Sequence, residues 1–340
     1  MKISILIPAH NEEHSIEATV NSCLNQTRPA DQIVVVNDGS TDKTASILSL
    51  FGDKIMVVTI PQATGNKSHA QEQGLKYVTG DIFISTDADT IMDKNFVKFI
   101  EEDFKENSVV AVAGYVRSKK HNWLTACRAF EYAVGQNLHK LAQHYIGFLF
   151  VIPGAAGAFR TDTFNKSINF DHDTLTEDLD FTYRLHKRGL RIYYDRRAVV
   201  VTQDPIAIGQ YINQMRRWFG GGWQCLIKHY TLATRNPQIA LELSLMYMEG
   251  LAFSVLLFIL PILSLKFYIT IILSYFVTAI AFGIFAAQKE HRWELIFIPI
   301  PYLFIVYIHS YIFIEQFIVE VIFRRKNLVW FKPERISTNS

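Results

Sequence analysis

Short, continuously hydrophobic runs alternate with helix-like stretches over the first hundred residues. The runs are the length of strands buried on both faces of a parallel sheet: Ile3 to Pro8, Gln32 to Val36, Ile55 to Ile60 and Asp81 to Thr86. The stretches between them predict crossover helices at about residues 12–26, 41–51 and 68–79. This alternation predicts an α/β layer with a crevice at the carboxyl ends of its strands.

The middle of the chain predicts longer helices. Trp123 to Tyr145 carries aromatic and basic residues, and either lies along a membrane surface or packs on the sheet as an ordinary amphipathic helix. Thr176 is placed to cap a helix that ends near Gly189. Ile206 to Tyr230 predicts one or two further helices that lead into the apolar part of the chain.

The C-terminal third is mostly apolar. Phe267 to Ala287 is a run of 21 residues without a charged side chain, which is long enough to cross a bilayer. Ile239 to Leu265 and Leu295 to Phe323 are nearly as apolar but contain glutamates. About three transmembrane helices are therefore expected. Three spans from a cytosolic domain would place the basic residues 324–326 outside, against the positive-inside tendency, so the number of spans and the side of the C-terminus stay open.

The pattern predicts a domain organisation and a location. Met1 to Pro8 is strand-like and is followed by acidic residues, so it does not resemble a signal peptide. We expect a cytosolic α/β domain with interfacial helices over residues 1–235, transmembrane helices over 236–325 and a polar tail over 326–340. This organisation predicts a multi-pass protein of the plasma (inner) membrane.

Composition excludes one class of partner. The net charge is +2 over 340 residues, and no basic-aromatic ladder occurs in the polar part, so nucleic acid is not an expected partner. The three cysteines lie far apart in the sequence without metal-type spacing, as is typical of reduced structural thiols.

Carboxylates follow the predicted strands. Asp87 and Asp89 are one residue apart, so in an extended strand end both point to one side and can share a divalent cation with phosphate oxygens. Asp38 follows the second strand beside Gly39 and can accept a hydrogen bond from a base N–H. Alone, each is more often a solvated turn residue. Their common place at strand ends favours a nucleotide site.

Other polar residues suggest roles around that crevice. Lys67 follows a glycine-containing loop and can meet a diphosphate as a point charge. Asp178 is a candidate general base for a hydroxyl nucleophile, with helix capping as its ordinary alternative. Gln214, Arg217 and Trp218 share one helical face, where Arg217 can hold a pyrophosphate and Trp218 can stack on a sugar ring.

Together these motifs resemble those of the family 2 glycosyltransferases with the GT-A fold, and specifically the membrane-bound processive branch of hyaluronan, chitin, cellulose and poly-N-acetylglucosamine synthases. The resemblance covers about residues 1–230, and Q-x-x-R-W after T-E-D is its most specific part. The matching segments are residues 8–13, 37–42, 65–75, 87–89, 157–160, 176–178 and 214–218.

The resemblance implies a Rossmann-like mixed sheet followed by transmembrane helices, and inverting transfer from a UDP-sugar to a hydroxyl of a growing polysaccharide or glycan. It implies Mg²⁺ or Mn²⁺ at Asp87 and Asp89, and Asp178 as the general base. The implied donor-binding residues are Pro8, Ala9, Glu12, Asp38, Lys67, Asp87, Gln214, Arg217 and Trp218. The implied acceptor-binding residues are Phe159, Arg160, Glu177 and Trp218.

The chain departs from the family pattern at two places. Its first sheet strand starts at Ile3, where family members usually begin with membrane helices. A polymer channel would then have to be built from two to four helices or from several subunits, so a homo-oligomer is possible. The other expected partners are a UDP-sugar donor, a glycan or lipid acceptor and the lipid bilayer. The Lys67 motif also carries Glu72 and Gln73 where the family more often has an asparagine and a variable residue.

Two other functions remain as alternatives. One is the transfer of a single sugar to a membrane lipid, although the branch that uses polyprenyl phosphate generally lacks the motif at residues 214–218. The other is a non-catalytic nucleotide-sugar-binding subunit of a membrane complex. The intact set of Asp87, Asp89, Asp178, Arg217 and Trp218 disfavours that reading.

Overall fold

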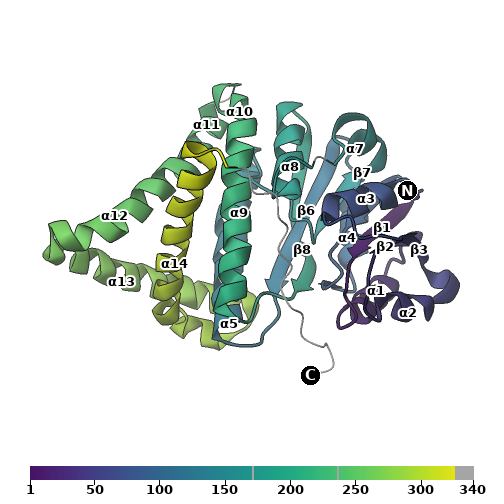
Figure 1. Ribbon diagram of the computed structural model, residues 1–340, viewed down its shortest axis with the longest axis horizontal. Helices are drawn as coiled ribbons and strands as arrows, with labels where there is room; N and C mark the ends of the chain where they lie inside the picture. The colour runs from purple at the N-terminus through teal and green to yellow at the C-terminus, as the bar shows by residue number, and fades with distance from the viewer. Residues whose placement is uncertain (171, 236, 326–340) are drawn as a thin grey trace. The chain divides into compact units, whose positions relative to one another are not determined.

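The computed structural model describes residues 1–170, 172–235 and 237–325, which form two compact units (Figure 1). The first, here called the sheet unit, comprises Met1–Arg117 and Lys140–Gln203. The second, the helical unit, comprises Ser118–His139 and, among the described residues, the chain from Asp204 to Arg325. The domain boundary expected after residue 235 stays a prediction, and the expected polar tail, residues 326–340, lies outside the described residues.

The sheet unit is built on an eight-stranded mixed sheet with the strand order β3-β2-β1-β4-β7-β6-β8-β5. Strands β1 to β4 pair in parallel, β7 is antiparallel to both β4 and β6, and β5 is antiparallel to β8. The α/β layer predicted from the hydrophobic runs and the mixed sheet implied by the family resemblance are both confirmed. The strands are β1 (Ile3–Ala9), β2 (Gln32–Asp38), β3 (Met56–Ile60), β4 (Ile82–Ser85), β5 (Ile91–Met92), β6 (Val109–Ser118), β7 (Gly157–Arg160) and β8 (Arg191–Thr202).

Helices connect these strands. In the sheet unit they are α1 (Ile16–Leu24), α2 (Thr44–Ser49), α3 (Lys67–Leu75), α4 (Phe96–Asp103), α6 (Lys140–Ile146), α7 (Thr161–Ser167) and α8 (Glu177–Lys187), with the 3-10 turn η1 (Gly52–Lys54). Helix α3 lies very close to the sheet at Gly74, where a Cβ atom would lie 2.4 Å from a methyl of Val36 and 2.5 Å from one of Leu6. The missing side chain therefore lets α3 pack directly on β1 and β2, which places its first residue at the carboxyl end of the sheet.

The first two helices begin later than the sequence predicts. The loops before them are held instead by side chains that bond to the backbone. The side chain of Asn11 accepts a hydrogen bond from the backbone N–H of Thr41 at 2.8 Å, and that of Asp42 accepts one from Glu13 at 3.1 Å. Asn and Asp compete with helical hydrogen bonds in this way. The loops after β1 and β2 are thus held together by hydrogen bonds between them.

The helical unit contains the remaining helices. They are α5 (Trp123–Val134), the π-helix η2 (Gly135–His139), α9 (Ile208–Lys228), α10 (Thr231–Arg235), α11 (Pro237–Ser244), η3 (Leu245–Glu249), α12 (Gly250–Leu263), α13 (Leu265–Glu290), η4 (Trp293–Phe297), α14 (Pro299–Phe317) and η5 (Ile318–Ile322). Helix α14 lies beside α9 and α12, and α5 packs against α13 and α14 (Figure 1). The helical segment predicted over residues 123–145 is therefore divided between the two units. Its first part, α5, packs on apolar helices of the helical unit, and its last part, α6, packs on β8 of the sheet unit.

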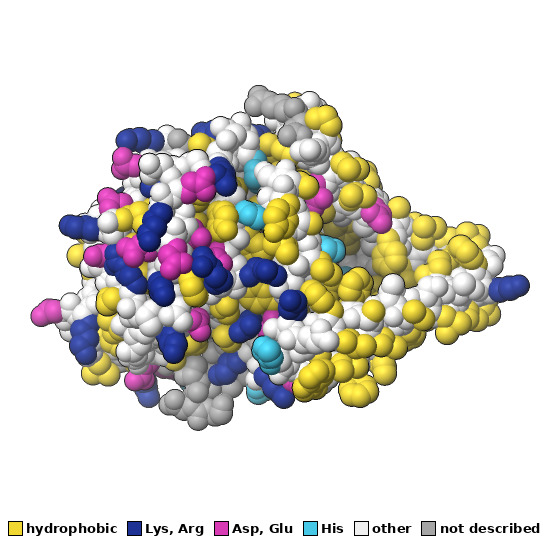
Figure 2. Space-filling model, turned by 180° about the vertical axis from the view of Figure 1, so that it is seen from behind, with side chains coloured by type: hydrophobic (Ala, Val, Ile, Leu, Met, Phe, Trp, Pro, Cys, Tyr) yellow, Lys and Arg dark blue, Asp and Glu magenta, His cyan; other side chains and the backbone are white. Residues whose placement is uncertain are grey.

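Three helical segments are long and apolar enough to cross a membrane: Pro237–Leu263, Leu265–Glu290 and Pro299–Ile322. Many of their large side chains face outward, including Ile262, Val277 and Ile300 at 85, 74 and 67% exposure. Figure 2 shows hydrophobic side chains gathered over the helical unit and charged ones over the sheet unit. The three apolar helices predicted from the sequence are present.

Candidate active site

Lys67 occupies the centre of a charged group at the carboxyl end of the sheet. Its ammonium forms an ion pair with Asp87, and it lies 3.4 Å from Oε1 of Glu177. Burial disfavours the charged amine, but Asp87, Glu177 and Asp178 outweigh that effect and raise the pKa of Lys67. Three separate predicted motifs, the Lys67 loop, D-x-D and T-E-D, therefore meet around one permanent cation.

Gly154, in the loop before β7, lies directly against this charged group. A Cβ atom at this position would lie 2.9 Å from Nζ of Lys67, 3.8 Å from Oε1 of Glu177 and 4.0 Å from Cβ of Asp178. No motif in the sequence singles out this glycine. Its only local signal is its place in a small-residue stretch, residues 154–158, which carries no indication of what lies against it.

Asp87 and Asp89 differ in their surroundings. The side chain of Asp87 is one-third exposed, whereas Asp89 is 5% exposed and accepts a hydrogen bond from the hydroxyl of Thr90 at 3.2 Å. Both follow β4, and both offer carboxylate oxygens, the donors that Mg²⁺ and Mn²⁺ prefer. The donor chemistry of this pair therefore fits a hard divalent cation.

Asp38 is held at the end of β2 by Thr64. Its carboxylate accepts hydrogen bonds from the backbone N–H of Thr64 at 2.9 Å and from the Thr64 hydroxyl at 2.7 Å. Gly39 has φ +57°, and a Cβ atom there would lie 2.2 Å from the backbone nitrogen of Ala63. The positive φ and this close approach together require glycine. The loop before Lys67 is thereby anchored on Asp38.

The other predicted residues around the nucleotide follow the same sheet edge. Pro8 and Ala9 end β1, where they pair with β2. Glu12 is buried, and its carboxylate accepts a hydrogen bond from the hydroxyl of Ser15 at 2.6 Å. Apart from Lys67 at the start of α3, the predicted donor-binding residues of the sheet unit therefore lie at or just beyond the carboxyl ends of β1, β2 and β4.

Helix α8 presents Asp178 in its first turn. Thr176 is at the N-cap position but makes no capping hydrogen bond with its side chain, so that expectation is corrected. Oδ1 of Asp178 accepts from the backbone N–H of Leu179 at 2.9 Å. The hydroxyl of Thr182 donates to the carbonyl of Asp178 and accepts from the backbone N–H of Ile152, which ties the start of α8 to the loop before β7.

Lys140 is a second lysine that interacts electrostatically with Asp178, although no motif in the sequence indicates it. It begins α6, is 8% exposed, and its ammonium lies 5.3 Å from the ring centroid of Tyr194. Burial lowers the pKa of Lys140 to about 7, while the charge of Asp178 acts in the opposite direction. The sheet unit thus contains a permanent cation at Lys67 and a titratable one at Lys140.

Gln214, Arg217 and Trp218 lie on α9, within the helical unit. The guanidinium of the buried Arg128 lies 4.8 Å from the ring of Trp218 and bonds Asp204 at 3.3 Å. An arginine over an indole is a favourable cation–π contact. The indole predicted to meet a sugar is therefore packed on one face by a residue of α5.

Arg216, next to Arg217, has a structural partner. It forms two hydrogen bonds of 2.8 Å with the carboxylate of Glu315 on α14. This pairing accounts for a glutamate in an otherwise apolar predicted span. Sequence spacing alone did not connect the two residues.

Phe159 and Arg160 have structural contacts on β7. Phe159 is buried in the core, where it stacks on Phe83 at 5.2 Å between ring centroids. Arg160 donates hydrogen bonds to the backbone carbonyls of Val109 and Phe104 at 2.8 and 2.9 Å. Their expected role at the acceptor approach stays a prediction.

Comparisons with known proteins agree with this architecture. Residues 4–163 match the family model described as "Glycosyl transferase family 2". The chain is 29% identical over 243 residues to a poly-beta-1,6-N-acetyl-D-glucosamine synthase of Staphylococcus epidermidis, covering 70% of this chain and 59% of that protein. It is 29% identical over 239 residues to the synthase of the same name in Staphylococcus aureus strain COL, covering 69% and 58%. The chain thus matches a little over half the length of these relatives.

Solved structures share the fold. A mannosyltransferase, PcManGT of Pyrobaculum calidifontis, in complex with GDP-Man and Mn²⁺, superposes with a TM-score of 0.67 at 18% identity, covering 96% of this chain and 88% of that one. Residues 1–349 of S. aureus TarS in complex with UDP-GlcNAc give 0.54 at 19% identity, covering 93% and 91%. With the strand order described above, these comparisons show that residues 4–163 match glycosyl transferase family 2 and that the chain has the GT-A fold.

Proposed function

We propose that this protein transfers N-acetylglucosamine from UDP-N-acetylglucosamine to a hydroxyl of a growing β-1,6-linked polysaccharide, at the cytosolic face of a membrane. The observation that carries the proposal is the meeting of Lys67, Asp87 and Glu177 directly beside Asp178. A compact cation, a carboxylate that can hold a metal ion and a candidate base suit the displacement of a diphosphate by a hydroxyl. The names of the relatives supply the choice of sugar and product.

In the proposed reaction Asp178 removes the proton from the acceptor hydroxyl. The acceptor oxygen attacks the anomeric carbon of the sugar from the side opposite the diphosphate, so the configuration inverts. The bond between that carbon and the β-phosphate oxygen breaks, and UDP leaves with the electron pair. Asp178 holds the proton at its carboxylate, and Lys67 stabilises the negative charge that develops on the diphosphate.

Other residues bind and orient the donor in this proposal. Asp38, positioned by Thr64, and Glu12 face the uridine, and Pro8 and Ala9 form the adjoining backbone. Asp87 and Asp89 would hold Mg²⁺ or Mn²⁺, which when bound neutralises diphosphate charge. Gln214, Arg217 and Trp218 are proposed as donor-binding residues on the basis of their sequence motif alone. Trp218 and Glu177 are also proposed to contact the acceptor.

The proposal is tested with the full chain in native membranes or mild detergent and a panel of labelled UDP-sugars, followed by sizing of the product. A polymer formed from UDP-N-acetylglucosamine supports it. A product that extracts into organic solvent indicates transfer of a single sugar to a lipid, and binding of UDP-sugar without UDP release indicates a non-catalytic subunit. Either outcome overturns the proposal.

Asp178→Asn tests the base. Loss of a general base costs about 10²- to 10⁴-fold in rate, while UDP binding is retained. Asp162→Asn is a matched control, because the Asp162 side chain is 86% exposed on α7. Rapid turnover by the Asp178→Asn enzyme contradicts the assignment. Undiminished activity in excess chelator contradicts the metal role of Asp87 and Asp89.

A further inference from the structure

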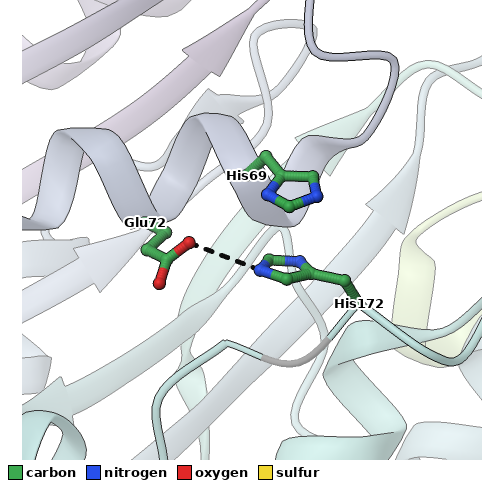
Figure 3. A group of neighbouring side chains, drawn as sticks. All are labelled: His69, Glu72 and His172. Atoms are coloured by element: carbon green, nitrogen blue, oxygen red, sulfur yellow. Dashed lines mark hydrogen bonds and ion pairs between the residues drawn. The ribbon is translucent and has the colours of Figure 1, made fainter.

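Two histidines and a glutamate from distant segments converge beside the Lys67 helix (Figure 3). His69 and Glu72 are three residues apart on α3 and so lie on the same face of that helix. His172 comes from the segment between α7 and α8, 100 residues from Glu72. The ligand atoms of all three lie within 4.8 Å of one another.

The spacing approaches that of a tetrahedral metal site. Nε2 of His172 lies 3.3 Å from Oε2 of Glu72. Ligands about 2.0–2.1 Å from a zinc ion, arranged tetrahedrally, are about 3.4 Å apart. Binding requires the widest ligand pair to close by about 1.4 Å from the 4.8 Å limit, a movement within reach of side-chain rotation.

The rings of His69 and His172 are stacked, which an ion pair between His172 and Glu72 does not by itself require. The ring centroids lie 3.6 Å apart, with the planes at 20°. Glu72 and His172 alone would make a surface ion pair, which does not require His69. One nitrogen of each ring lies within 4.8 Å of the other and of a carboxylate oxygen of Glu72. Two imidazoles and one carboxylate form a common ligand set for zinc.

Partial burial suits a bound ion with an open position. The side chains of His172 and Glu72 are 29% and 44% exposed, and His69 is half-buried. A site of three protein ligands leaves a fourth place for water or for a ligand. This site should also prefer a different metal from Asp87 and Asp89. Imidazole favours zinc and related metals, whereas carboxylates alone favour Mg²⁺ and Mn²⁺.

We propose that His69, Glu72 and His172 bind one zinc-type transition-metal ion that ties α3 to the segment leading into α8. Lys67 is two residues before His69, and Glu177 is five residues after His172. Both side chains meet at the charged group described above. The ion therefore joins the two chain segments that deliver Lys67 and Glu177, and its occupancy sets how firmly those groups are held.

Binding is measured on the full chain in detergent, with millimolar Mg²⁺ present to occupy carboxylate sites. Co²⁺ serves as a spectroscopic probe, because tetrahedral Co²⁺ absorbs far more strongly in the visible range than octahedral Co²⁺, and Zn²⁺ competes for the same site. We expect one equivalent with tetrahedral-type absorption, displaced by Zn²⁺. His69→Ala, Glu72→Gln and His172→Ala should each weaken binding at least tenfold, and Zn²⁺ should raise the melting temperature of the unmodified protein but not of these three variants.

His14→Ala is the matched control, because His14 also pairs with a neighbouring glutamate, at 3.6 Å, and belongs to no three-ligand group among the described residues. Its metal binding should match that of the unmodified protein. The proposal is overturned if Co²⁺ absorption survives in all three ligand variants, or if Asp87→Asn abolishes it while they do not. Because the readout is metal binding, a negative result leaves the proposed transfer reaction untouched, and a failure of that reaction leaves this site untouched.

Discussion

Replacing the buried Lys140 with methionine should stabilise the protein near neutral pH, by an amount that shrinks as the pH rises. Burial lowers the pKa of Lys140 from 10.5 to about 7. The unfolded chain therefore holds this proton up to about pH 10.5, whereas the folded chain releases it near pH 7. Between these values the unfolded state binds more protons, so stability rises with pH.

The shift sets the size of the effect. One pKa unit corresponds to about 1.4 kcal/mol. Lys140 thus costs the folded state about 4 kcal/mol at pH 7 and about 2 kcal/mol at pH 9, and methionine of similar length removes that cost. The ring of Tyr194, 5.3 Å from the ammonium, returns only a small part of it. At roughly 2 °C per kcal/mol for a large chain, the variant should melt about 8 °C higher at pH 7 and about 4 °C higher at pH 9.

The assay is thermal unfolding of the full chain in one detergent at pH 6.5 to 9.5, recorded as the difference between variant and unmodified protein at each pH. That difference cancels the other titrating groups. Lys98→Met is the control, because Lys98 is exposed on α4, and it should melt close to the unmodified protein. A Lys140→Met difference that stays constant across this range, or a variant that is less stable throughout, would refute the reasoning.

Three further substitutions test the contacts around the sites. Gly154→Ala places a Cβ 2.9 Å from Nζ of Lys67 and should lower kcat about tenfold, because it displaces the ammonium from its proposed place beside the diphosphate. Gly209→Ala is the control, since nothing lies within 4 Å of its added Cβ, and it should leave kcat unchanged. Thr64→Val removes one hydrogen bond to the Asp38 carboxylate and should weaken UDP binding, measured by calorimetry, by about ten- to a hundredfold; tighter binding would show that Thr64 competes with the nucleotide. Glu315→Gln leaves Arg216 without its paired charge and should lower the melting temperature, and the double variant Arg216→Met with Glu315→Met should recover most of the loss; an unaltered single variant would mean that this pair contributes nothing to stability.

Local patterns in the sequence predicted the elements and the order of the motifs. Buried parallel strands are continuous hydrophobic runs, so β1 to β4 could be placed from sequence, as could the three apolar helices from residue 237 onward. The residues at the ends of those strands, such as Asp38 and Asp87, followed directly. Helix starts were predicted less well, because Asn11 and Asp42 bond to neighbouring loops rather than begin helices.

Only the tertiary structure decided which side chains meet. The meeting of Lys67, Asp87 and Glu177 joins the start of α3, the end of β4 and the start of α8, an arrangement that no local period encodes. The roles of Gly154 and Lys140 depend on what the fold packs against them, and the approach of His172 to Glu72 joins segments 100 residues apart. Periodicity reports which face of an element is buried, whereas the contacts of a site arise from how separate elements are stacked.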